Sequence, residues 1–126
     1  MGWLEDLASN IESNLTLSSP IFLEAFDDAA QNCIAMISQP GTGNRHAAGI
    51  KILHRAELGI RVRNRDMEIA KSQAKTLSDY LELKTSFLSG TTWFKRITND
   101  NGFYHVSTDS TTGTIYSLNC YVEFEE

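Results

Sequence analysis

Two segments of the chain repeat their hydrophobic residues at steps of three and four, the spacing that lines one face of a helix. The first segment ends where Ser18, Ser19 and Pro20 disfavour a helix. Its hydrophobic positions are Trp3, Leu4, Leu7, Ala8, Ile11 and Leu15. The second segment begins near Asp66, a residue suited to cap a helix. Its hydrophobic positions are Ala70, Ala74, Leu77 and Leu81, and the two small alanines would let this helix lie close to a sheet.

The middle of the chain has the pattern of two β-strands. Residues 32–38, NCIAMIS, form an apolar run that is typical of a buried strand. From residue 50 to residue 63, apolar and polar side chains alternate. The inward set is Ile50, Ile52, His54, Ala56, Leu58, Ile60 and Val62, and the outward set includes Lys51, Arg55, Glu57, Arg61 and Arg63. Because this strand is long, we expect a bulge near Arg55–Ala56 or a strand that overhangs the sheet.

Further strands are predicted over residues 91–98, 103–107 and 114–126. The first two are joined by NDNG, in which Gly102 can take the positive φ of a turn. Residues 39–49, QPGTGNRHAAG, have the composition of a flexible loop. Residues 20–26, PIFLEAF, fit either a short strand or a turn of helix.

This order of elements indicates an α+β fold, because strands follow one another in runs instead of alternating strictly with helices. We expect one domain over residues 1–126, with a single mostly antiparallel β-sheet and two main helices packed on one face. A length of 126 residues leaves room for one hydrophobic core.

Composition and charge exclude several classes of protein. The net charge of −5 argues against a protein that holds DNA mainly by neutralising phosphates. Cys33 and Cys120 each lie in an apolar run, so we predict two buried free thiols, as in a reducing compartment. The N-terminus lacks the pattern of a secretion signal, and no apolar run approaches the roughly 18 residues of a membrane span. We therefore expect synthesis in a cytoplasm and no membrane partner.

No pattern in the sequence predicts catalysis, a cofactor or a metal ion. His46, His54 and His105 lie in separate segments without metal-ligand spacing. Gly41-Thr42-Gly43 has glycines like those of a phosphate loop, but no Lys-Ser/Thr pair follows and no helix begins there. There is no GxSxG elbow, and the adjacent carboxylates Asp27-Asp28 have the context of a solvated turn. We expect no catalytic, cofactor-binding or metal-binding residues.

The outward side of the long strand carries Arg61 and Arg63, and Arg65 follows directly. One interpretation is a solvated strand face that discourages aggregation. The other is a charged surface that contacts another subunit or DNA, although no aromatic residues alternate with the arginines as a single-strand platform would need. Both interpretations stay open. The candidate interface residues are these three arginines and four residues of the predicted loop, Thr42, Asn44, Arg45 and His46.

The segment GIRVRNRDMEIAKSQAKTLSDYL combines a strand ending in V-R-x-x-D with a helix that follows at once. LEDLASNIESNL and NCIAMISQPGTG precede it, and WFKRI, NDNGFYHVS and TIYSLNCYVEFEE follow it. Over roughly the whole chain, this ordered set resembles the tail-terminator and minor capsid proteins of long-tailed bacteriophages. PIFLEAFDDAAQ departs from the family pattern, because it is more apolar than the polar linker expected at that place.

The resemblance implies a structural protein that assembles as a homo-oligomeric ring, usually a hexamer, caps the tail tube and docks it to the head connector. Its partners would be the major tail protein and the head connector proteins, and DNA would pass through the lumen only as cargo. The ring would be part of the virion tail or neck after assembly in the host cytoplasm. The resemblance implies no catalysis and no cofactor, and it transfers no functional residues to this chain.

Two other functions remain open. One is a different neck role, as a head-tail joining or minor capsid protein. The other is a small cytoplasmic enzyme or ligand-binding domain with a pocket around His54 or His105. A closed ring needs two different complementary surfaces on each subunit. The acidic C-terminal EFEE and the three arginines are one such pair that the sequence offers.

Overall fold

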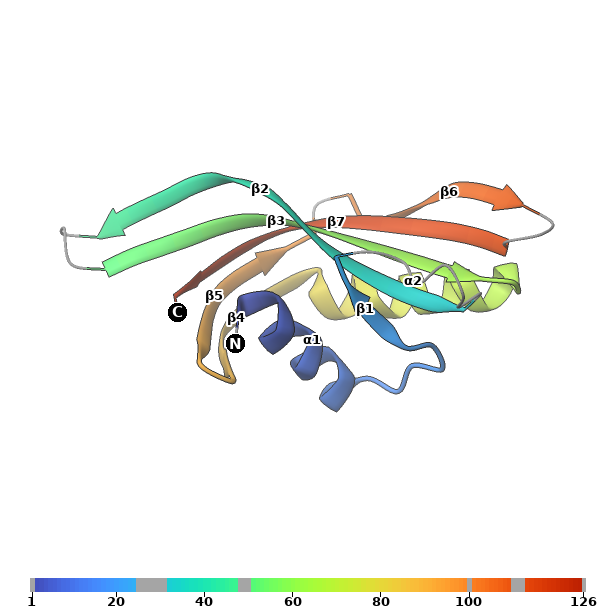
Figure 1. Ribbon diagram of the computed structural model, residues 1–126, viewed down its shortest axis with the longest axis horizontal. Helices are drawn as coiled ribbons and strands as arrows, with labels where there is room; N and C mark the ends of the chain where they lie inside the picture. The colour runs from blue at the N-terminus through green and yellow to red at the C-terminus, as the bar shows by residue number, and fades with distance from the viewer. Residues whose placement is uncertain (1, 25–31, 48–50, 100, 110–112, 126) are drawn as a thin grey trace.

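In the computed structural model, the described residues form two helices and one mostly antiparallel seven-stranded sheet (Figure 1), the fold class that the sequence predicts. The description covers residues 2–24, 32–47, 51–99, 101–109 and 113–125, with only the backbone described for 39–47, 51–53, 83 and 109. The elements are α1 (Trp3–Asn14), β1 (Ile21–Leu23), β2 (Cys33–Ala47), β3 (Lys51–Asn64), α2 (Met67–Leu81), β4 (Leu83–Ser89), β5 (Thr92–Thr98), β6 (Phe103–Asp109) and β7 (Gly113–Glu125). The strand order is β1-β2-β3-β7-β5-β4, and β6 also pairs with β7.

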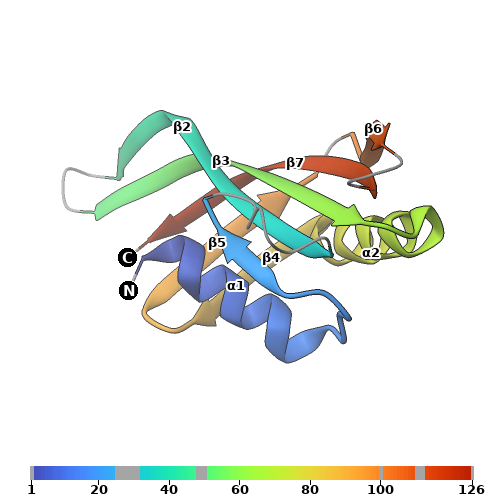
Figure 2. The ribbon, with the colours of Figure 1, turned by 45° about the vertical axis from the view of Figure 1, so that its right-hand side comes forward.

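Both helices pack against the same face of the sheet, as Figures 1 and 2 show. The predicted stripe of α2 is completely buried over β3 and β7, and it consists of Ala70, Ala74, Leu77 and Leu81. The alternating strands supply the other side of this core with Leu58, Ile60, Val62, Leu118, Cys120 and Val122. At the other helix, Leu7 and Ile11 are fully buried, and the ring of Trp3 stacks on Phe124 with 5.2 Å between centroids. The predicted core faces of both helices are therefore confirmed.

The short joint between β3 and α2 is fixed by side chains. Asp66 caps α2, because its Oδ1 accepts a hydrogen bond of 2.9 Å from the backbone N–H of Glu68. Asn64 Oδ1 accepts from the N–H of Asp66 at 2.9 Å, and Asn32 Oδ1 accepts from the N–H of Arg65 at 3.0 Å. These three bonds set the direction in which α2 leaves the sheet, and a longer loop is not needed.

The Gly/Pro-rich segment is part of a strand, so the predicted loop over residues 39–49 is wrong for residues 39–47. β2 continues to Ala47, and Gly43–Ala47 pairs with Lys51–Arg55 of β3. Pairing with a long partner strand overrides the weak strand propensity of glycine and proline. The register shifts between Gln39 and Gly43, so the Pro-Gly sequence lies in an irregular part of the ladder. Residues 48–50 lie outside the described part of the chain.

Of the two irregularities that the sequence led us to expect in the long strand β3, the overhang is confirmed, whereas the bulge lies in the partner strand β2. The register shift in β2 lies opposite Arg55–Glu57, and β3 overhangs β7, because the last pair between them is His54 with Phe124. Beyond that pair, Lys51–Leu53 pairs with β2 alone among the described strands. The β2–β3 hairpin therefore projects from the sheet at one end (Figure 1).

β5 and β6 do not form a hairpin, although they are consecutive in the chain. Both pair with the same edge of β7, β5 with Tyr121–Glu125 and β6 with Gly113–Leu118. They lie end to end along that edge, and Asn119 and Cys120 lie between the two ladders. Gly102, just before β6, has the predicted positive φ, 67°.

Candidate functional site

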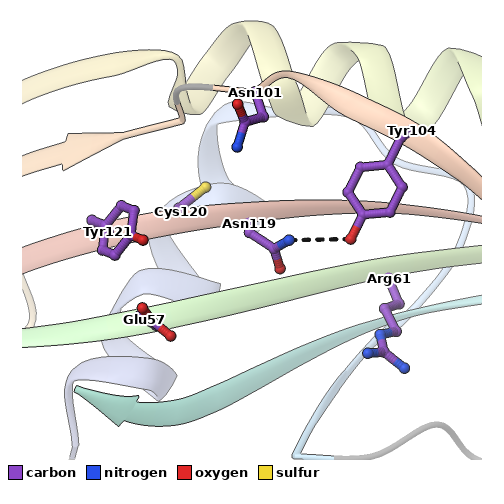
Figure 3. Close-up of a pocket in the computed structure, with 7 residues that line it drawn as sticks. All are labelled: Glu57, Arg61, Asn101, Tyr104, Asn119, Cys120 and Tyr121. Atoms are coloured by element: carbon purple, nitrogen blue, oxygen red, sulfur yellow. Dashed lines mark hydrogen bonds between the residues drawn. The ribbon is translucent and has the colours of Figure 1, made fainter. Parts of the chain in front are cut away.

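The face of the sheet opposite the helices carries a polar pocket, at the place where β7 passes from the β6 ladder to the β5 ladder. Its volume is about 320 Å³. Figure 3 shows the lining residues, which are Glu57, Arg61, Asn101, Tyr104, Asn119, Cys120 and Tyr121. Gly59, which has no side chain, pairs with Asn119 and leaves space between the neighbouring side chains. The pocket therefore follows from a gap in the pairing of β7 and a glycine beside it.

The pocket has two ends of opposite charge. Register pairs Arg61 with Ser117 and Ser117 with Tyr104, so Arg61 and Tyr104 share one end. Register also pairs Glu57 with Tyr121, and these two side chains form the other end. Tyr104 and Tyr121 are 46% and 42% exposed, so their rings lie at the rim of the pocket.

Tyr104 is held in place at the positive end. Asn119 Nδ2 donates a hydrogen bond of 3.1 Å to the Tyr104 hydroxyl. Hydrogen bonds with Ser117 and Asn119, together with a smaller effect of the Arg61 charge, lower the pKa of Tyr104 below its ordinary value. The Arg61 charge beside this hydroxyl makes this end of the pocket suitable for an anionic group.

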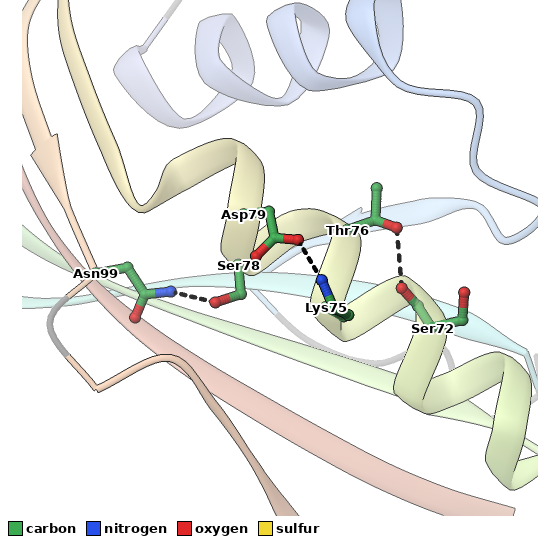
Figure 4. Close-up of polar contacts among 6 residues, drawn as sticks. All are labelled: Ser72, Lys75, Thr76, Ser78, Asp79 and Asn99. Carbon is green, nitrogen blue, oxygen red and sulfur yellow. Dashed lines mark hydrogen bonds and ion pairs between the residues drawn. The ribbon is translucent and has the colours of Figure 1, made fainter.

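The turn beside the pocket is tied to α2 (Figure 4). Asn99 Nδ2 donates to Ser78 Oγ at 2.8 Å, and both side chains are buried. This bond anchors the start of the connection that brings Asn101 to the pocket. Further along α2, Lys75 pairs with Asp79 at 2.7 Å, a contact on the exposed side of the helix.

The two cysteines are free and buried, as the sequence predicts. Cys120 lines the pocket, but its side chain points to the core, where it is 1% exposed. Burial raises the pKa of the Cys120 thiol to about 12. Because the thiolate is the reactive form, this thiol is inert at neutral pH.

The three candidate arginines lie in three different settings. Arg61 is exposed on the outer face, and Arg65 is exposed at the joint before α2. Arg63 is half-buried, and its Nη2 lies 3.6 Å from Cys33 Sγ across the β2–β3 pair. The interpretation of the arginines as a solvated strand face is therefore wrong for Arg63, since this guanidinium packs against a fully buried thiol.

The structure describes the other candidate residues only in part. Thr42, Asn44, Arg45 and His46 belong to β2, and their side chains lie outside the described part of the structure. The ring of His54 stacks on Phe124 with 5.1 Å between centroids. His105 Nε2 lies 2.6 Å from Thr108 Oγ1 on β6. Neither histidine lines the pocket, so the idea of a pocket built around them finds no support there.

Two strand edges and one apolar pair are further exposed features of the described residues. β1 pairs with Ile34–Met36 of β2, and from Ile37 to Ala47 the same edge of β2 has no partner strand among the described residues. At the opposite side of the sheet, β4 pairs with β5 alone, as far as the structure describes the chain. Leu88 of β4 and Trp93 of β5 are paired neighbours that are 62% and 43% exposed.

Comparisons with known proteins do not identify a family. Neither the comparison with models of protein families nor the search of curated proteins finds a match. Within the described residues, no group of three or more His, Cys, Asp or Glu side chains is arranged to hold a metal ion. Neither α1 nor α2 combines the length and apolar character needed to cross a membrane.

Proposed function

We propose that this protein is a structural ring protein of a bacteriophage tail, resembling a tail terminator that caps the tail tube and docks it to the head connector. Its partners in this proposal are further copies of itself, the major tail protein and the connector proteins. DNA passes through the lumen as cargo. The proposed family is taken from the sequence resemblance. The proposed mechanism of assembly, in which subunits pair through strands, is taken from the exposed strand edges.

The observation that carries the proposal is the edge of β2 from Ile37 to Ala47, which has no partner strand among the described residues. A strand edge presents unpaired backbone donors and acceptors, which another chain can satisfy by adding a strand. The distal part of the β2–β3 hairpin has no third described strand beside it. Because a two-stranded hairpin alone is only marginally stable in water, such an arm gains stability from a neighbour.

β4 is the complementary surface in this proposal. It lies at the far side of the sheet from β2, so β2 of one subunit can pair with β4 of the next and continue the sheet. The two surfaces differ, as a head-to-tail ring requires. The exposed pair Leu88 and Trp93 would add an apolar contact at the centre of this interface.

The arginines take separate roles in the ring. Arg61 and Arg65 are exposed and would contact the tail tube or the connector, where they meet acidic groups. Arg63 belongs to the fold through its contact with Cys33. The interface between subunits therefore rests on backbone pairing, and the charged contacts serve docking.

Sedimentation velocity over a range of concentrations tests the assembly, with electron microscopy of the largest species. We expect monomers or weak oligomers in dilute solution, and closed rings with a lumen wide enough for duplex DNA at high concentration. Leu88→Glu places a charge in the proposed interface and should prevent ring formation. Met67→Glu is the matched control, because Met67 is 48% exposed on α2, away from both edges, and this variant should form rings like the parent.

A salt-resistant dimer at every concentration would contradict the ring. The same holds if Leu88→Glu and Met67→Glu assemble equally well. Both variants replace an exposed side chain, so their melting temperatures should stay close to that of the parent.

A further inference from the structure

We propose that the outer-face pocket binds a zwitterion of dipeptide length, with its carboxylate at the Arg61–Tyr104 end and its ammonium group at the Glu57–Tyr121 end. This binding site goes beyond the proposed ring assembly, because the pocket lies at the centre of the sheet face and not at the β2 or β4 edge. A subunit that has not assembled would carry it as well.

The shape of the pocket limits what can enter. A volume of 320 Å³ corresponds to about ten water molecules, at roughly 30 Å³ each in the liquid. This is at the small end of ligand pockets, which begin at about 300 Å³. The space therefore suits a group of one or two amino-acid residues.

The spacing of the charged residues favours two residues over one. Glu57 and Arg61 are four positions apart on β3, which is about 13 Å at roughly 3.3 Å per residue. Their side chains stand on the same face of the sheet, and an ionic contact of about 2.8 Å at each end leaves about 7 Å for the ligand. An extended dipeptide spans about 7 Å, whereas a single amino acid spans about half of that.

The chemistry of each end matches one terminus of a dipeptide. The Arg61 guanidinium and the Tyr104 hydroxyl can both donate to a carboxylate, and the Arg61 charge already acts on Tyr104. The Glu57 carboxylate and the Tyr121 hydroxyl can both accept from an ammonium group. Between them, the amides of Asn101 and Asn119 can bond to the peptide group, and Gly59 leaves room for its backbone.

Tyr104 at the positive end and the connection that carries Asn101 are positioned before any ligand arrives. Tyr104 is held by Asn119 at 3.1 Å, and Ser117, which is 2% exposed, lies beneath it. The connection that carries Asn101 is anchored by the buried bond between Asn99 and Ser78. A site whose groups are already in place loses little entropy on binding.

Titration of ¹⁵N-labelled protein with L-alanyl-L-alanine, followed by NMR, tests the proposal. We expect saturable shifts confined to the amides around Gly59, Tyr104 and Asn119. Alanine, N-acetyl-dialanine and dialanine amide should each bind at least tenfold more weakly, because each lacks the length or one of the two charges. Binding should be the same for Leu88→Glu, so the result does not depend on whether rings form.

Variants then assign the two ends. Arg61→Gln and Glu57→Gln should each weaken dialanine binding at least tenfold. Gly59→Val should abolish binding, because the valine side chain would fill the space that Gly59 leaves in the pocket. Arg96→Gln is the matched control, because Arg96 is exposed on β5 outside the pocket, and it should bind like the parent. Shifts that do not saturate, that lie elsewhere on the protein, or that are equal for Arg61→Gln and Arg96→Gln would overturn the proposal.

Discussion

Asp6 of α1 clamps the turn between β4 and β5, and its removal should destabilise the protein strongly. Its side chain is 3% exposed, and Oδ2 accepts a hydrogen bond of 2.6 Å from Thr92 Oγ1. The backbone carbonyl of Asp6 also accepts from Ser89 Oγ at 2.7 Å. Gly90, in the turn, has a φ of 59° and lies directly against the carboxylate.

The expected cost of Asp6→Ala follows from these contacts. A hydrogen bond to a charged group contributes about 1.5–3 kcal/mol, and an unsatisfied buried donor costs about 1–3 kcal/mol. Thr92 is fully buried, so its hydroxyl cannot turn to water when the carboxylate is removed. We expect a loss of about 3 kcal/mol in the free energy of unfolding, a large share of a typical 5–15 kcal/mol. For a chain of this length, that lowers the melting temperature by about 10 °C.

Urea denaturation of Asp6→Ala, Thr92→Val and the double variant measures this clamp. The double variant should lose less than the sum of the single losses, with a coupling of about 1–2 kcal/mol. Glu12→Ala is the control, because Glu12 is exposed on the same helix and should change stability by less than about 0.5 kcal/mol. A loss below about 1 kcal/mol for Asp6→Ala, or a coupling near zero, would refute the reasoning.

Two further predictions concern backbone strain and alkaline pH. Gly113→Ala should cost more than about 2 kcal/mol in urea denaturation, because Gly113 has a φ of 97° and a Cβ there would meet the backbone of Asn64. Gly102→Ala, with a φ of 67° and only an ordinary contact of its Cβ with Ser78 Oγ at 4.0 Å, should cost only about 1 kcal/mol, and equal costs would contradict this explanation. The pKa of Cys120 is raised to about 12 in the folded protein, against an ordinary value of 9.0. The contribution of the protonated thiol to stability is therefore complete below pH 9, and it is lost as the pH rises through the pKa of the folded state. Between pH 9 and pH 11, the free energy of unfolding of Cys120→Ala should therefore fall less than that of the parent, and the difference should be about 1.4 kcal/mol per pH unit. Parallel losses of stability in the two proteins would contradict this prediction.

The helices and the central strands could be predicted from the sequence because their burial is periodic. The stripe from Ala70 to Leu81, the cap at Asp66 and the alternation of β7 each depend on residues close together in the chain. In each case the local pattern and the tertiary packing favour the same structure. The two buried cysteines were predicted for the same reason, since each lies within an apolar strand.

The extension of β2 could not be predicted, because it depends on a partner. The segment from Gln39 to Ala47 has the composition of a loop, and only pairing with β3 makes it a strand. β4 was missed because Leu83–Ser89 is short and shows no clear alternation, and it forms by pairing with β5. β1 was left ambiguous for a similar reason, since it has three residues and pairs with β2 alone in the part of the chain that the structure describes.

The pocket could not be predicted from the sequence, because it depends on how the strands are arranged along β7. NDNG between two strands predicts a hairpin, but β5 and β6 lie end to end along β7 and leave a gap at Asn119. Arg61 was named as a candidate from its alternation, whereas its neighbours Tyr104 and Asn119 come from strands far along the chain. The burial of Arg63 against Cys33 likewise depends on the register of β2 with β3.

The most direct test of head-to-tail assembly is crosslinking between the two proposed edges. Asn44→Cys lies in the part of β2 that has no outer partner strand among the described residues, and Thr85→Cys lies in β4, while the native thiols are buried and unreactive. A short bis-maleimide applied to the variant with both substitutions should give a ladder of covalent oligomers that ends at one closed species, a hexamer. The variant with Asn44→Cys and Ser72→Cys, whose second thiol lies on α2, should give no ladder. If the β2–β4 pair gives only monomers or dimers under conditions where the protein is assembled, or if both pairs give the same products, the ring is not built through these edges.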